Sequence, residues 1–119
     1  MKLMPQEIEV WYLIPALRRE LAKVLIGEYG MSQKKVSEMF MITESAVSQY
    51  LKSKRGYELR FPKTGLEEIR KTAEKISSGE GEANNLLYML CVKFRGTEHV
   101  CDFHRKQDKS LPKNCDLCC

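Results

Sequence analysis

The stretch from Ser32 to Gly56, SQKKVSEMFMITESAVSQYLKSKRG, decides the fold that this sequence predicts. It reads as two short helices, each introduced by a residue that can cap it, Ser32 for the first and Thr43 for the second. The hydroxyl of such a residue accepts a hydrogen bond from a free backbone N–H in the first helical turn. Only Met41 and Ile42 stand between the first helix and the second cap. The spacing therefore predicts a helix, a tight turn and a second helix.

The second of these helices has two unlike sides. We expect Tyr50 and Leu51 to be buried on one side together with Ala46 or Val47, because these positions recur at helical spacing. The opposite side carries Glu44, Ser45, Ser48, Gln49 and Lys52. Short hydrogen-bonding side chains on an outward face suit a helix that lies in the DNA major groove, where they can meet base edges. The alternative is a helical bundle whose polar faces are only solvated.

This segment resembles the Xre-type helix-turn-helix of phage repressors and their cellular relatives, with SQKKVSEMF as the scaffold helix and TESAVSQYL as the recognition helix. The resemblance implies a transcriptional regulator that binds a double-stranded DNA operator. The residues it places against base edges are Glu44, Ser45, Ser48 and Gln49. Those it places near the sugar-phosphate backbone are Thr43, Lys52, Lys54 and Arg55, with Gln33 near a phosphate or supporting the recognition helix. Readers of this kind usually bind as two-fold dimers, so a homodimer is expected.

Two positions depart from the family pattern: Ser37 stands where the family usually has alanine, and the second departure is at the turn. The family usually has glycine at the turn, where this chain has Met41. If the turn requires a positive φ, a residue other than glycine stores backbone strain there.

The rest of the chain predicts further helices. The first main helix should begin near Ile14, with Pro15 in its first turn, and end before Gly30. Trp11 and Tyr12, just before it, should pack on the core, with packing on a second subunit as the alternative. A second amphipathic helix is marked by Leu66, Ile69, Ala73 and Ile76, and a third begins at Leu86, after a connector over residues 77–84. The expected fold is all-α, with a DNA-binding domain over residues 1–60, a helical linker or dimerisation region over 61–90 and an irregular cysteine-rich tail over 91–119.

All five cysteines of the chain lie in that tail. Cys115 and Cys118 form a C-x-x-C pair, and Cys101 forms a C-x-x-H pair with His104. Two metal centres fit this pattern. Cys91, Cys101, Cys115 and Cys118 could hold an iron-sulfur cluster, or His104 could replace Cys91 in a tetrahedral zinc site. We favour the cluster, because the gaps of nine and thirteen residues between the first three cysteines are looser than in most zinc knuckles. A tail with few apolar residues would also need such a centre to hold its shape.

The whole arrangement resembles a group of archaeal regulators in which an Xre-type reader precedes a helical linker and a cysteine-rich C-terminus. This resemblance implies that the tail couples DNA binding to redox state, oxygen or iron. In that group a C-x-x-C-R element tends to come first, whereas this chain has CVKFR, with Phe94 in place of the second cysteine. Cys91 is then the natural fourth thiolate.

Composition excludes several other classes. No apolar stretch approaches the ~20 residues that cross a bilayer, and no secretion signal follows Met1, so we expect a cytoplasmic protein without a membrane role. The net charge of +4 is compatible with binding phosphates but does not establish it. No catalytic triad, phosphate-binding glycine loop or metalloprotease motif is present, so we expect neither an enzyme nor a small-molecule substrate. A thiol redox or electron-transfer protein remains the alternative, although no strand pattern precedes Cys115 as such a site would require.

Overall fold

The structure is a computed structural model that describes residues 1–117, so Cys118 and Cys119 lie outside the described part of the chain. Residues 1–117 form helices, turns and loops without any strand, which confirms the all-α prediction. In chain order the elements are α1 (Pro5–Ile8), the π-helical segment η1 (Glu9–Leu13), α2 (Ile14–Gly27), α3 (Gln33–Phe40), α4 (Glu44–Leu51), α5 (Lys63–Ser78), α6 (Ala83–Phe94) and α7 (Glu98–Gln107). Among the described helices none is long and apolar enough to cross a membrane.

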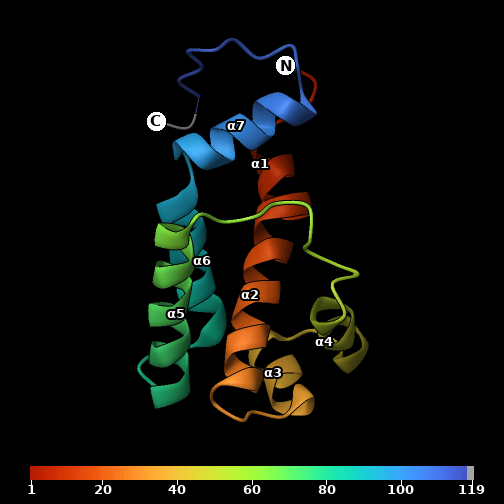
Figure 1. The fold of residues 1–119 in the computed structure, drawn as a ribbon, viewed down its shortest axis with the longest axis vertical. Helices are drawn as coiled ribbons and strands as arrows, with labels where there is room; N and C mark the ends of the chain where they lie inside the picture. The colour runs from red at the N-terminus through yellow and green to blue at the C-terminus, as the bar shows by residue number, and fades with distance from the viewer. Residues whose placement is uncertain (118–119) are drawn as a thin grey trace.

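Helix α2 is the centre of the molecule and contacts α3, α4, α5 and α6 (Figure 1). Its residues Leu17, Leu21 and Leu25 are fully buried at helical spacing. The same core takes in Val47 from α4 and Ile69 from α5. The two helices of the predicted DNA-reading motif are therefore held by one continuous apolar core with the rest of the chain.

The first main helix begins earlier than the sequence predicts. The α-helical part does start at Ile14, but α1 and η1 precede it without a break, so the chain is helical from Pro5 onward. The N–H of Ile14 bonds to the carbonyl of Glu9, five residues back, and this wider turn comes directly before Pro15. Pro15 has no N–H to contribute to the regular i→i−4 ladder, and the ladder is widened in the turn directly before it. The prediction that Trp11 packs on the core is wrong, since its side chain is exposed.

The predicted irregular tail is also wrong over most of its described length. Helix α6 runs past Cys91 to Phe94, and α7 follows after a short turn. Helix α7 lies across the end of the molecule at which the chain begins (Figure 1). The rings of Phe103 on α7 and Tyr12 on η1 meet edge to face, with centroids 5.0 Å apart. Packing against the N-terminal helix therefore orders this segment and supplies a stabilisation that the sequence pattern attributes to a metal centre.

Polar contacts strengthen the same junction. Asp108, just after α7, is only 3% exposed, and its carboxylate accepts hydrogen bonds from the backbone N–H groups of Lys2 (2.5 Å) and Leu3 (2.8 Å). The Nε2 atom of the buried His104 lies 2.7 Å from the carbonyl oxygen of Leu3. The first residues of the chain are thus fixed to its C-terminal helix.

Candidate nucleic-acid interface

Helices α3 and α4 follow each other across a tight turn, with both expected caps in place. The Ser32 hydroxyl accepts a hydrogen bond from the backbone N–H of Lys35 (3.0 Å), and the Thr43 hydroxyl accepts one from Ala46 (3.0 Å). Met41 ends α3 in the left-handed conformation, with φ of 57°. The expectation of a positive φ at this non-glycine position is confirmed.

The burial pattern of α4 agrees with the two sides predicted for it. Ala46, Val47 and Tyr50 are buried, and Leu51 is half-buried. On the opposite side Glu44 and Ser45 are exposed, and Ser48 and Gln49 are half-buried. Helix α4 is therefore anchored to α2 by one side and presents hydrogen-bonding side chains on the other.

The segment after α4 carries basic side chains into solvent. Lys52, Lys54 and Arg55 are exposed, and the ion pairs among residues 1–117 involve none of them. Their charges are consequently available to an external anion such as a backbone phosphate. We call residues 52–56 the basic loop.

The first turn of α3 adds three further exposed polar residues. Gln33 is one of the predicted contacts, whereas Lys34 and Lys35 were not among the predicted site residues. The signal for these two lysines was present in the letters SQKK, which place both directly after the N-cap Ser32 in the first turn of the helix. The free N–H groups and the partial positive charge of a helix N-terminus favour phosphate at the same place.

A buried arginine on α2 holds the basic loop through a hydrogen bond. Arg19 on α2 is 7% exposed. Its Nη2 atom donates to the Ser53 hydroxyl (3.1 Å), its Nε lies 3.4 Å from the same oxygen, and its Nη1 pairs with the Glu20 carboxylate. Ser53 itself has a φ of 57° and, like Met41, is a left-handed residue other than glycine.

A glycine holds the other end of the loop against α2. Gly56 has a φ of 72°, and a Cβ atom added to it would stand 2.3 Å from the carbonyl oxygen of Pro15. No side chain fits between the two backbones. Arg19 and Gly56 thus fix the basic loop on α2 at two points.

The predicted metal ligands differ from one another in burial and surroundings. Cys91 is buried in α6, and burial, assisted by the nearby Glu9 carboxylate, raises the pKa of its thiol to about 11. Cys101 on α7 and Cys115 are half-buried, and the predicted ligand Cys118 lies outside the described residues. His104, the alternative ligand, is engaged with the Leu3 carbonyl.

The described part of the chain contains no group of three or more His, Cys, Asp or Glu side chains that could hold a metal ion. A cysteine that ligates a cluster or zinc does so as a thiolate, and the buried environment of Cys91 disfavours that form.

Comparison with known proteins adds no relative: no family model, no curated protein and no solved structure matches this chain.

Proposed function

We propose that this protein is a sequence-specific DNA-binding transcriptional regulator that reads the major groove with α4. The observation that carries the proposal is the combination of a capped helix-turn-helix, an outward polar face on α4 and unpaired cations directly after it. In this arrangement Glu44, Ser45, Ser48 and Gln49 contact base edges. Thr43, the basic loop and the first turn of α3, including Gln33, lie along the sugar-phosphate backbone.

The test begins with selecting bound duplexes from a randomised pool and measuring their affinity by fluorescence anisotropy. Gln49→Ala should lower affinity for the selected sequence by about 1–3 kcal/mol and relax the preference at particular base pairs, because a base contact discriminates by that amount. Lys54→Ala should weaken binding to all sequences alike and reduce its salt dependence. Lys75→Ala, an exposed lysine on α5, is the matched control and should change neither. Equal loss on every sequence for Gln49→Ala would argue against base reading by α4.

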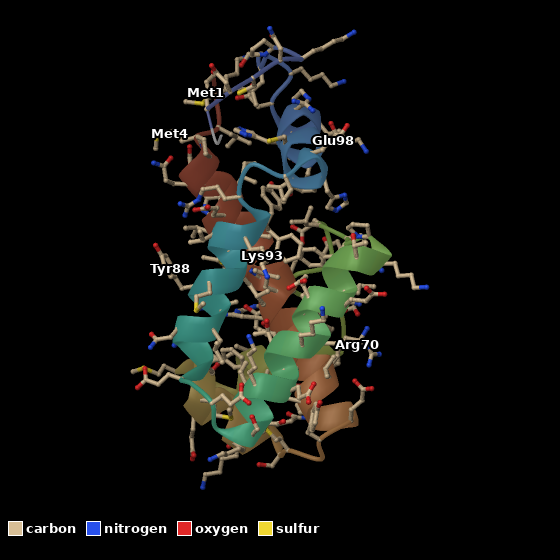
Figure 2. All side chains as sticks on the ribbon, turned by 90° about the vertical axis from the view of Figure 1, so that its left-hand side faces the viewer. Met1, Met4, Arg70, Tyr88, Lys93 and Glu98 are labelled. Atoms are coloured by element: carbon tan, nitrogen blue, oxygen red, sulfur yellow. The ribbon has the colours of Figure 1, made fainter. Side chains whose placement is uncertain are left out.

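We also propose that the regulator acts as a homodimer through α6. That helix is apolar on its outward side as well as on its inward side: Tyr88 is 64% exposed, Met89 61% and Val92 44%. Figure 2 shows Tyr88 pointing away from α5. A helix that is apolar all round is usually covered on both sides, and a second copy of the chain would supply the two-fold symmetry that operator binding requires.

The proposal that the cysteines sense redox state, oxygen or iron through a cluster rests on the C-x-x-C spacing of Cys115 and Cys118 alone. Its test is the iron, sulfide and zinc content of protein purified without oxygen. Matched iron and acid-labile sulfide would support a cluster, and one zinc per chain would support the structural alternative. Metal-free protein with intact thiols would remove both and leave DNA binding without a metal signal.

A further inference from the structure

We propose that Arg19 and Ser53 together are positioning residues for DNA binding: Arg19, through the Ser53 hydroxyl, sets the conformation in which the basic loop meets the DNA backbone. This inference rests on the proposed function and assigns a role to Arg19, which does not itself face DNA, and to the Ser53 hydroxyl with which it hydrogen-bonds. Arg19 is buried, so it cannot bind phosphate directly.

The buried guanidinium of Arg19 needs polar partners. A charged group at 7% exposure is costly unless hydrogen bonds and an opposite charge compensate it. Glu20 supplies the charge, and Ser53 supplies an acceptor from a segment 34 residues away in the chain. Because Arg19 stands on the central helix, this contact fixes the end of α4 relative to the core.

The backbone of Ser53 is strained. Its φ of 57° is one that glycine adopts without strain, and the neighbouring N–H of Lys54 bonds to the Gln49 carbonyl at 2.8 Å, as in a usual helix C-terminus. Glycine would satisfy the backbone better, but it has no hydroxyl to accept from Arg19. The strain at Ser53 is thus offset by a contact that only its side chain makes.

The contact between Arg19 and Ser53 lies within the basic loop. Lys52 precedes Ser53, and Lys54 and Arg55 follow it. The left-handed turn at Ser53 therefore determines the directions in which three exposed cations leave the loop. A phosphate contact requires a cation at a defined place, so disorder in this turn would cost affinity even though all three charges remain.

The test uses Ser53→Gly, which permits the same backbone conformation but lacks the hydroxyl, with Ser53→Asn as the rescue variant. Asparagine tolerates the left-handed region and offers an amide oxygen to Arg19. Binding of a fluorescent mixed-sequence duplex of about 20 bp, two turns of DNA, is measured across a range of salt concentrations. Thermal unfolding of each variant is measured in parallel.

At ~0.1 M salt, Ser53→Gly should weaken binding about tenfold for each phosphate that the loop no longer binds. The salt slope, which is the slope of log affinity against log salt concentration, should become shallower by about 0.9 for each such phosphate. Ser53→Asn should restore both. Arg19→Lys, which keeps the charge but loses the planar fork, should act like Ser53→Gly, and the double variant should be no weaker than either single one. A purely structural role would change the unfolding temperature without changing the salt slope.

Failure of the positioning role can be distinguished from failure of the proposed function. If the unmodified protein binds duplex DNA with a steep salt dependence and Ser53→Gly has the same affinity and slope, the positioning role is refuted and the proposed function stands. If the unmodified protein shows no salt-dependent binding to DNA, both are refuted.

Discussion

Gly56 is the residue at which the interface depends most directly on the absence of a side chain. Gly56→Ala must both hold a positive φ and move a Cβ away from the Pro15 carbonyl, 2.3 Å distant. We expect a loss of about 2–4 kcal/mol in the free energy of unfolding. Gly30→Ala is the matched control: its φ is 67°, but nothing lies within 4 Å of the added atom, so only about 1 kcal/mol of backbone strain is expected. Urea denaturation of the two variants measures the difference, and equal losses would contradict the close approach to Pro15.

At Met41 a substitution to glycine, and not away from it, should stabilise the protein. Its side chain is exposed and its φ is 57°, so the side chain gains little from burial while the backbone is strained. Met41→Gly should raise the free energy of unfolding by about 0.5–1 kcal/mol, because the relief of left-handed strain exceeds the added entropy of the unfolded chain. Met39→Gly, inside α3, is the comparison and should destabilise the protein. A loss of stability in Met41→Gly would mean that the methionine side chain contributes a contact that outweighs the strain.

Asp108 makes the stability of the protein depend on pH. Hydrogen bonds from the Ser110 hydroxyl and from the backbone N–H groups of Leu3 and Lys2 hold the pKa of its carboxyl well below the ordinary value. A group whose pKa is depressed on folding stabilises the fold above its unfolded pKa, near 3.8, and loses that contribution as the pH falls through the folded value. Unfolding temperatures should therefore decrease below about pH 4. Asp108→Asn should lower the unfolding temperature at pH 7 and flatten this decrease, whereas Asp102→Asn, on the exposed side of α7, should do neither.

At the scale of the elements, the sequence predicts best where local signals decide the structure. The two N-caps, the tight turn between the helices and the buried side of α4 follow from residues within one or two helical turns of each other, and all are confirmed. Helix α7 was missed because its order depends on partners about a hundred residues away, such as Leu3 and Tyr12. Val100, Phe103 and His104 do recur at helical spacing within residues 98–107, but the pattern is short, and the other end of the chain completes the packing of this side of the helix.

The residues of the candidate interface also include some that local sequence signals reveal and some that depend on distant contacts. The outward side of α4, with Glu44 and Ser45 exposed and Ser48 and Gln49 half-buried, could be read from helical spacing. Arg19 could not, because an arginine inside an amphipathic helix pattern gives no sign that its side chain turns inward to Ser53. The roles assigned to the cysteines depend on which thiols meet in space, and spacing along the chain does not determine that.

The place of Cys91 within α6 leads to a prediction about metal removal. Its thiol is buried in the core and its raised pKa, about 11, favours the protonated form. If the purified protein contains metal, Cys91→Ala should leave the metal content unchanged, while Cys115→Ser should reduce it, since Cys115 is half-buried and part of the C-x-x-C pair. Elemental analysis of both variants measures the effect. Loss of metal from Cys91→Ala would mean that α6 rearranges to release this thiol.

At the scale of the whole molecule, the two proposed surfaces lie on different flanks of the central helix. Helix α4 stands on one side of α2, and α6 stands with α5 on the other (Figure 1). Helix α6 contacts α2, α3 and α5 through its inward residues, so its outward side is not used within the described chain. Pairing through α6 would therefore leave both recognition helices free to bind DNA.

The exposed stripe on α6 comprises Tyr88, Met89 and Val92, and it is smaller than the ~800 Å² per partner that a stable interface usually buries. We therefore expect a monomer in sedimentation at low micromolar concentration and two copies per duplex once the operator holds both half-sites together.

Tyr88→Asn should leave affinity for a single half-site unchanged and lower the cooperativity of binding to the full operator about tenfold, because an aromatic residue at an interface contributes about 1–2 kcal/mol. Tyr29→Asn, an exposed tyrosine after α2, is the matched control. Full cooperativity in Tyr88→Asn would show that the two copies meet through another surface.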